Sequence, residues 1–248
     1  MIRLCICGLV LASVSNVQAT KGADLIYDIK DDWSDVNNPN GAWQLNKAPN
    51  SPFTVNQSDW AGNGTNQKAW ADAASPGTAH VPAWMKVTNT SIFTAGFVDV
   101  GTIVMHGAEE ARTGTDLSSL VWTSPLAGTV TITGGMWKEV NTRSMRWEIR
   151  KDGTLLSLGD LNAVDPYTKT NPYDFSAGSG GAGAMTFSVS AGTKVELLAY
   201  RTSTFASFVG MNYRVTLTPV PEPGTWLLSS LSVATIVFVR SRKKTTRQ

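Results

Sequence analysis

The clearest pattern along the chain is a regular alternation of apolar and polar residues in its second half. In residues 145–150 Met, Trp and Ile alternate with Arg, Glu and Arg, and in residues 211–217 Met, Tyr, Val and Leu alternate with Asn, Arg and Thr. A period of two turns one set of side chains toward a core and the other outward, which is typical of a half-buried β-strand. Shorter stretches of the same kind lie at 120–123, 129–133, 185–189 and 195–200.

Turn signals separate these stretches. Asp152–Gly153 stands between two apolar runs and predicts a two-residue hairpin. Pro or Gly also follows the apolar stretches at 124–128 and 191–193, and the Gly-rich run 176–184 predicts a flexible loop. Short alternating strands, with no convincing helix between residues 20 and 218, predict an all-β fold, an antiparallel β-sandwich over 20–218.

The first half of the chain has weaker periodicity. Residues 24–29 predict an opening strand, whereas 44–80 predict short strands joined by long loops, and 84–87 and 97–105 restore the strand pattern. Residues 31–43 are dense in Asp, Asn, Pro and Gly, which favour tight turns. Oxygen-rich runs also ligate calcium, so a calcium site is an alternative interpretation, although the spacing does not fit an EF-hand loop.

Both ends of the chain differ in composition from this body. Residues 1–19 combine Arg3, an apolar stretch and a final Val-Gln-Ala, which predicts a cleaved secretory signal peptide. Residues 225–239 are an apolar run of about 22 Å as a helix, which predicts a short transmembrane helix. The tail 240–248 predicts a positive stop on the cytoplasmic side, formed by Arg240, Arg242, Lys243 and Lys244.

The segment 219–224 joins the body to the apolar run. Its three prolines donate no backbone hydrogen bond and keep the chain extended. It contains the motif Val220, Pro221, Glu222, Pro223 and Gly224. Together with the short apolar run and the basic terminus, this motif resembles the PEP-CTERM sorting signal of Gram-negative bacteria. The alternative is an ordinary C-terminal anchor helix behind a Pro-rich linker.

The resemblance to PEP-CTERM proteins implies a route. The Sec translocon and signal peptidase would export the chain, and the tail would hold it as a precursor anchored in the inner membrane. An exosortase, which is a membrane Cys protease or transpeptidase, would then cut near the motif. The body would leave for the cell surface or the extracellular polysaccharide matrix. The resemblance covers only the tail, so it concerns the cellular location of the protein rather than its activity.

A second, looser resemblance concerns the body. Residues 122–132 form a strand–turn–strand pattern around Pro125 and Gly128, the Asp152–Gly153 hairpin follows, and residues 187–196 repeat the pattern around Gly192. Over 115–218 this order resembles the jelly-roll domains of secreted bacterial proteins, including domains like carbohydrate-binding modules. It implies a jelly-roll sandwich with a carbohydrate ligand.

Charge and cysteine content exclude several functions. Setting aside Arg3 and the tail, with its five bases and one acid, leaves 15 bases and 18 acids in residues 20–218, a net charge of −3. This mildly acidic body gives no electrostatic reason to expect nucleic-acid binding. Cys5 and Cys7 both lie in the predicted signal peptide, so the predicted mature body has no disulfide, thiol catalysis or Cys-based zinc site.

The tryptophans are the most distinctive candidate residues. Trp122 and Trp147 are in phase with strand faces and are predicted to be core residues. The candidate ligand-binding residues lie instead among Gly, Asn and Ser: Trp43, Trp60, Trp70 and Trp137. Exposed rings stack on the apolar faces of sugars while neighbouring amides bond the hydroxyls. The alternative is that these rings plug the ends of the sandwich.

No catalytic or metal constellation stands out. His80 and His106 lack metal-type spacing, and no nucleophile elbow occurs. The loop after His106 predicts solvated charges, with a metal or acid/base site as the alternative. The carboxylates that could serve glycoside cleavage are scattered: Asp99, Glu139, Glu148 and Glu196. We therefore expect a non-catalytic exported protein without a cofactor that contacts exopolysaccharide; the alternative is a polysaccharide-active hydrolase or lyase.

Overall fold

The computed structural model describes residues 22–62, 64–73, 81–107, 117–202 and 205–220. Within these ranges the protein is all-β, with two antiparallel sheets and a few short 3-10 helices. No helix of the described part is long and apolar enough to cross a membrane. The predicted signal peptide, the motif residues 221–224, the apolar run 225–239 and the basic tail lie outside the described residues. Residues 23–220 form one compact unit.

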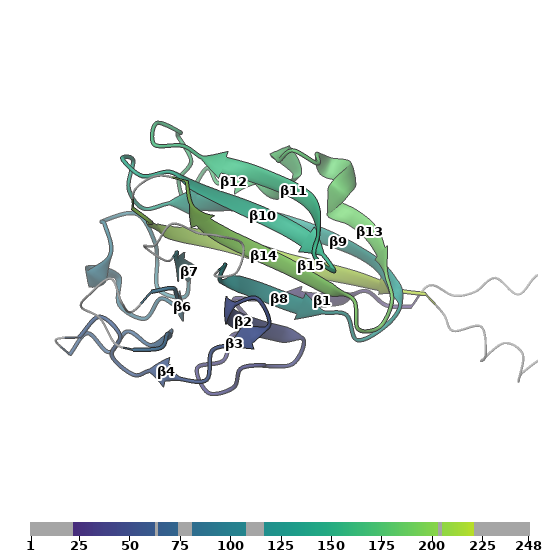
Figure 1. Ribbon diagram of the computed structural model, residues 1–248, viewed down its shortest axis with the longest axis horizontal. Helices are drawn as coiled ribbons and strands as arrows, with labels where there is room; N and C mark the ends of the chain where they lie inside the picture. Colours follow the sequence, from purple (N-terminus) through teal and green to yellow (C-terminus); the bar gives the residue numbers. More distant parts are fainter. Residues whose placement is uncertain (1–21, 63, 74–80, 108–116, 203–204, 221–248) are drawn as a thin grey trace, which may run out of the picture. The chain divides into compact units, whose positions relative to one another are not determined.

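The larger sheet contains nine strands of the described chain, in the order β12-β9-β15-β7-β6-β5-β4, with β1 also on β15 and β13 on β9 (Figure 1). They are β1 (Leu25–Asp28), β4 (Asn56–Gln57), β5 (Ala69–Trp70), β6 (Ala83–Lys86), β7 (Ile103–His106), β9 (Gly128–Lys138), β12 (Tyr173–Asp174), β13 (Thr186–Val189) and β15 (Phe208–Pro219). The long strand β15 is its central element, because β9 pairs along one edge of it and β7 and β1 share the other.

The smaller sheet contains six strands of the described chain, in the order β11-β10-β14-β8-β2-β3 (Figure 1). They are β2 (Trp43–Ala48), β3 (Ser51–Pro52), β8 (Ser119–Thr123), β10 (Met145–Lys151), β11 (Thr154–Leu161) and β14 (Lys194–Arg201). Strand β14 lies between β8 and β10, from which it is distant in sequence. The chain therefore passes repeatedly from one sheet to the other.

The main core lies between the two sheets. Along β15 the alternation predicted from the sequence is confirmed: Met211, Tyr213, Val215 and Leu217 are buried, whereas Asn212 is exposed. Rings from the two sheets meet edge to face, with centroids 5.8 Å apart for Trp43 and Tyr213. The predicted core tryptophans are also confirmed, since Trp122 and Trp147 are fully buried here: both are 0% exposed.

A second apolar core covers the opposite side of the larger sheet. Successive strand residues point to opposite faces, so in β7 Ile103 and Met105 join the main core and Val104 joins the second. The second core is built from Trp60, Ala69, Ala71, Ala83, Met85, Val87, Phe93, Phe97, Val98, Val104 and Trp137. The loop-rich part of the chain thus packs as a third layer, which the weak periodicity of residues 44–80 did not predict.

One local prediction is wrong. Residues 97–100, expected to form a strand, form an irregular segment between Gly96 and Gly101, which have φ values of +80° and +88°. Phe97 and Val98 are buried by the second core instead of by strand pairing. The Gly-rich run, expected to be flexible, contains two 3-10 helices, Phe175–Ala177 and Ala182–Met185.

The hairpin predicted at Asp152–Gly153 is confirmed. β10 and β11 pair up to Lys151 and Thr154, so the loop has two residues. Asp152 and Gly153 have φ values of +46° and +78°. Positive φ at both loop positions gives the turn a twist that matches the flanking strands.

Candidate functional site

The four candidate tryptophans are buried. Their exposed fractions are 3% for Trp43, 6% for Trp60, 3% for Trp70 and 1% for Trp137. None of these rings offers an open face on which a sugar could stack, so the expectation of exposed platforms is not met. The alternative interpretation, in which these tryptophans pack inside the protein, agrees with their burial. The loops that carry them are polar in sequence, but they fold so that their few large apolar side chains are enclosed.

The polar atoms of these rings are also engaged internally. The indole N–H of Trp43 donates to Asp32 Oδ2 (2.9 Å), that of Trp70 to the Ser34 carbonyl (2.9 Å) and that of Trp137 to the Phe97 carbonyl (3.0 Å). Trp60 packs edge to face against Phe208, with ring centroids 5.9 Å apart. Each ring therefore serves to join a loop to a sheet.

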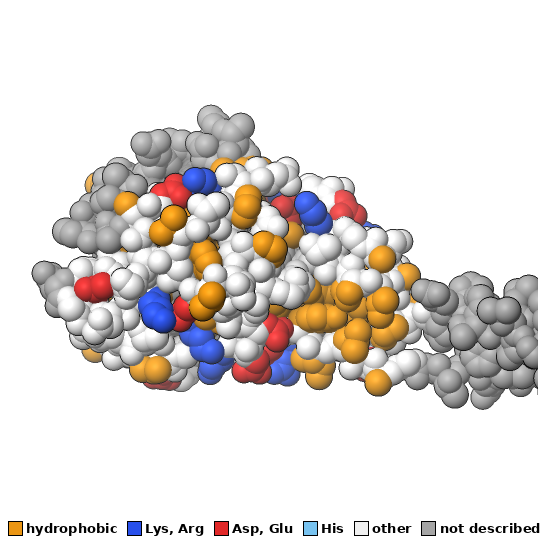
Figure 2. Space-filling model, turned by 90° about the horizontal axis from the view of Figure 1, so that it is seen from below, with side chains coloured by type: hydrophobic (Ala, Val, Ile, Leu, Met, Phe, Trp, Pro, Cys, Tyr) orange, Lys and Arg blue, Asp and Glu red, His pale blue; other side chains and the backbone are white. Residues whose placement is uncertain are grey.

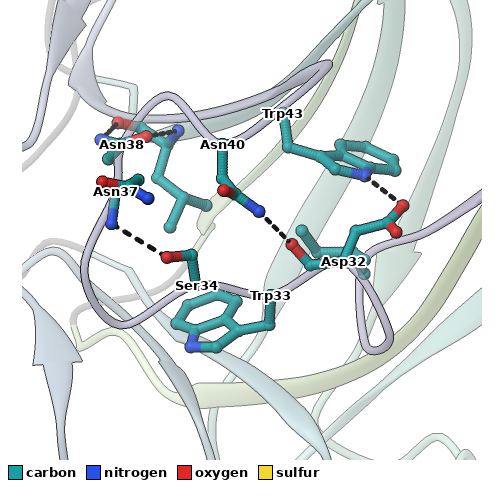
Figure 3. Close-up of a pocket in the computed structure, with 9 residues that line it drawn as sticks. Asp32, Trp33, Ser34, Asn37, Asn38, Asn40 and Trp43 are labelled. Carbon is teal, nitrogen blue, oxygen red and sulfur yellow. Dashed lines mark hydrogen bonds between the residues drawn. The ribbon is translucent and has the colours of Figure 1, made fainter.

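The Asp- and Asn-rich loop of residues 31–43 is a set of tight turns, as the first interpretation predicted (Figure 3). The Asn38 side chain hydrogen-bonds to backbone groups as a neighbouring strand would. Its amide donates to the carbonyls of Leu45 (2.8 Å) and Phe53 (2.9 Å), and its oxygen accepts from the Leu45 N–H (2.7 Å). Asn40 Nδ2 donates to the Asp32 carbonyl (2.8 Å).

One carboxylate oxygen of this loop that a calcium ion could use already accepts two hydrogen bonds. Asp32 Oδ2 accepts from the Trp43 indole and from the Asp28 N–H (3.1 Å). The cavity inside the loop measures only about 10 Å³, about the room of one water molecule. In the described part of the chain no group of three His, Cys, Asp or Glu side chains is placed to hold a metal.

His106 and two of the four flagged carboxylates have structural contacts. His106 lies edge to face against Phe208 at 4.5 Å between ring centroids. Asp99 pairs with Lys169 at 2.8 Å, and Glu139 Oε1 accepts from the Thr94 N–H (2.8 Å). His80 and the loop 108–116 lie outside the described residues.

The other two flagged carboxylates share the outward face of the smaller sheet. In the register of β10 and β14, Glu148 lies opposite Leu198 and Arg150 lies opposite Glu196. Residues diagonal to each other on one face of an antiparallel pair are about 7–8 Å apart, so Glu148 and Glu196 are close neighbours with Arg150 beside both. The sequence predicted a charged outer face for residues 146, 148 and 150, and this is confirmed.

Glu148 is the centre of this polar face. Its side chain is only 7% exposed, and Arg150 Nη2 lies 2.6 Å from Oε2. Its other oxygen, Oε1, accepts a hydrogen bond of 2.5 Å from the Tyr200 hydroxyl. Burial and this hydrogen bond raise the pKa of Tyr200 to about 12, so the hydroxyl stays a donor at neutral pH.

A second pair extends the polar face toward β11. Arg146 Nε and Nη2 donate to the two oxygens of Asp160 at 2.8 and 2.9 Å, a bidentate arrangement. The hydrogen bonds that Arg146 donates to Asp160 raise the pKa of Arg146 further above its ordinary value. Arg146, Glu148, Arg150, Asp160, Glu196 and Tyr200 are hereafter called the polar ladder.

A groove of about 400 Å³ adjoins one end of the polar ladder. It is lined by Pro49, Asn50, Leu117, Ser119, Arg150, Asp152, Gly153, Lys194, Glu196 and Leu198. Its walls therefore carry an amide, carboxylates and cations, and leucine and proline side chains supply apolar surface. This mixture of apolar contact and convergent polar groups is what a carbohydrate ring and its hydroxyls require.

One polar atom of the groove lacks a partner. The Ser119 hydroxyl is buried and makes no hydrogen bond in the structure. It is one of six buried side-chain atoms without a hydrogen-bond partner in the described part of the chain, the others belonging to Trp122, Lys138, Trp147, Ser207 and Tyr213, so it does not by itself mark a ligand site.

The sequence alone could not reveal this site. Glu148 and Glu196 were flagged only as scattered carboxylates, because the pairing of β10 with β14 brings together residues almost fifty positions apart. Ser119 and Asn50 carry no local signal. Comparison with protein-family models and with curated proteins finds no match for this chain.

Proposed function

We propose that the protein is an exported, non-catalytic surface or matrix protein, which is sorted through its C-terminal tail and contacts extracellular polysaccharide with its smaller sheet. The sorting half of the proposal rests on the order of the tail: the motif Val220–Gly224, an apolar run and a basic end, behind an N-terminal export signal. Its partners would be the Sec translocon, signal peptidase and an exosortase.

The binding half of the proposal rests on one observation, the groove of about 400 Å³ beside the polar ladder, whose walls combine apolar and polar side chains. The crossing of the chain between the sheets, from β8 to β9 to β10 and from β13 to β14 to β15, supports a jelly-roll interpretation of the sandwich. Ligand contact on a sheet face needs no cofactor, and we propose none.

The sorting proposal is tested by substituting Glu222. It stands between two prolines and supplies the one charge of the motif, so Glu222→Ala should leave the melting temperature of the body unchanged and hold the protein in the inner membrane. Fractionation of cells into inner membrane and medium gives the measurement. Normal release of the variant would leave a simple anchor helix as the better interpretation.

The binding proposal is tested with a glycan array and the purified body, residues 20–220. Glu196→Gln and Asn50→Ala should each weaken binding, because both side chains line the groove. Asp99→Asn is the matched control, since Asp99 is highly exposed and lies outside the groove. If the wild-type body retains no glycan, or if the control weakens binding equally, the groove is not the binding site.

A polysaccharide hydrolase or lyase is the second candidate, and the shared face of Glu148 and Glu196 is the observation in its favour. Against it, both oxygens of Glu148 are already held by Arg150 and Tyr200. A general acid needs a proton on one of those oxygens. Release of reducing ends from polysaccharide, measured with and without calcium and lost in Glu148→Gln, would favour the enzyme.

A further inference from the structure

The points where the chain enters and leaves the domain lie side by side. Leu25, near the start of β1, pairs with Leu217 near the end of β15 (Figure 1). The Val220 N–H donates to the Ala127 carbonyl at 3.1 Å, so the end of β15 is tied to the turn before β9. We call this part of the domain the terminal end.

Exposed apolar side chains gather at the terminal end. Leu25 is 37% exposed, Ile26 62%, Leu126 43% and Val220 58%. Figure 2 shows hydrophobic side chains concentrated toward the right-hand end, which is where β15 finishes in Figure 1. Large side chains of this kind clustered on one end of a domain mark a surface that contacts another phase or partner.

Two lysines lie close to these apolar residues. The Ser124 N–H donates to the Thr193 carbonyl (2.9 Å), which places Lys194 next to the turn that carries Leu126. Lys194 also exchanges hydrogen bonds with Asp152, the neighbour of Lys151. Lys194 is the nearer of the two, and the Lys151 amine donates to the Ser188 carbonyl (2.8 Å). Because the carboxylates of Asp24 and Asp152 also lie in this part of the domain, the two lysines give the terminal end no excess of positive charge.

The length of the following chain limits where this end can lie. Only residues 221–224 separate Val220 from the apolar run that begins at Thr225. Five fully extended residue steps span at most about 18 Å. If residues 225–239 span the membrane, as the proposed function requires, the terminal end is held next to the bilayer surface.

We infer that the terminal end docks on the surface of the bilayer while the precursor is anchored. Leu25, Leu126 and Val220 enter the interface between headgroups and acyl chains. This inference rests on the proposed anchoring. It adds an orientation: Arg146 and Asp160, at the other end of the polar ladder, point away from the membrane, whereas the groove, which Asp152 and Lys194 line, stays near the bilayer until the body is released.

Fluorescence quenching tests the docking. The chain 20–248 contains no cysteine, so Leu126→Cys and Val164→Cys each give a single site for an NBD label. Val164 is 92% exposed and follows the far end of β11, so it is the matched control. In vesicles of phosphatidylethanolamine and phosphatidylglycerol with nitroxide-labelled lipid, the label at 126 should be quenched several-fold more than that at 164.

Further arms separate the possible failures. The double variant Leu25→Gln/Val220→Gln should reduce quenching at position 126, because it removes two of the exposed apolar side chains that enter the interface. Equal quenching at 126 and 164 in a chain that floats with the vesicles overturns the docking and leaves the anchor standing. A chain that does not float with vesicles at all overturns the anchor and the docking with it. A label at 126 that is shielded from water yet not quenched by lipid indicates a protein partner and overturns the bilayer as occupant.

Discussion

At the scale of single residues, tryptophans fix the third layer to the larger sheet. The Trp137 ring lies flat over the neighbouring strand, where a Cβ on Gly210 would come within 2.4 Å of its Cε2 atom. The same relation holds between Trp147 and Gly159. Glycine at these positions leaves room for the ring, and the indole N–H of Trp137 then reaches the Phe97 carbonyl in the third layer.

Trp137→Ala should therefore be a large loss of stability. The variant removes a ring that is 1% exposed together with its hydrogen bond, and truncation of a buried Trp costs about 3–5 kcal/mol. Val164→Ala, at a position that is 92% exposed, is the control and should change stability little. Urea unfolding of the body gives both values, and equal midpoints for the two variants would contradict the packing role.

Lys138 is a buried lysine with an unsatisfied amine. It is 3% exposed, its amine has no hydrogen-bond partner among the described residues, and burial lowers its pKa, an effect that the charge of Asp165 partly offsets. An unsatisfied buried donor costs about 1–3 kcal/mol, so Lys138→Met should raise the free energy of unfolding by a similar amount at neutral pH. Lys47→Met, at an exposed lysine paired with Asp72, is the control and should be near neutral.

The raised pKa of Tyr200 makes the stability of the protein depend on pH above about pH 10. Its pKa in the folded protein is about 12 against 10.0 for a free tyrosine, so on raising the pH the unfolded chain loses this proton first. The contribution of the protonated Tyr200 hydroxyl to the free energy of unfolding is therefore complete below pH 10 and is lost between pH 10 and 12. Glu148→Gln should move the Tyr200 pKa down toward 10, as measured by the ultraviolet absorbance of tyrosinate. The raised pKa of Tyr213, which burial alone causes, serves as the internal control.

At the scale of elements, strands were predictable where one face meets the core and the other meets solvent. β10 and β15 alternate cleanly for that reason, and the sequence placed both correctly. The third layer could not be predicted in the same way, because its short strands and loops bury side chains without a period. Phe97 is buried through a turn beside Gly96, and no pattern in the local sequence distinguishes that from a strand.

The candidate site was less predictable than the strands. The outward residues of a single strand could be predicted from its alternation, as the Arg-x-Glu-x-Arg pattern of β10 shows. What makes a site is the register between β10, β11 and β14, which sets Arg146 against Asp160 and Arg150 against Glu196. Strand pairing over long sequence separation is a tertiary property, and no local propensity encodes it.

The hairpin between β10 and β11 offers a test at this scale. Gly153 has a φ of +78°, and a left-handed conformation costs a residue with a Cβ about 1–2 kcal/mol. Gly153→Ala should lower the free energy of unfolding of the body by that amount. It should also disturb the shape of the groove, because Gly153 is one of its lining residues. Gly183→Ala is the control, since a Cβ there meets nothing within 4 Å. Thermal melts that shift equally for both variants would contradict the turn assignment.

At the scale of the whole molecule, the structure places the end of the folded body slightly later than the sequence did. The predicted boundary was Thr218, whereas β15 continues to Pro219 and the Val220 N–H bonds the Ala127 carbonyl. The last strand of the body therefore runs directly into Val220, the first residue of the motif for which we propose a sorting role.

Truncation at defined points tests how much of β15 the body needs. A chain of residues 20–220 should melt at the same temperature as the body of the longer chain 20–248, because residues 23–220 contain the whole described core. A chain that ends at Arg214 loses Val215 and Leu217, both 0% exposed, and with them the pairing of β1 and half the pairing of β9. Removing two fully buried aliphatic side chains costs about 2–5 kcal/mol each, which is comparable to the total stability of a small domain. The chain 20–214 should therefore show no cooperative melt by circular dichroism. A cooperative melt of 20–214 at the temperature of 20–220 would mean that the fold does not need the second half of β15. The conclusion that the folded body extends to the proposed sorting motif would then be contradicted.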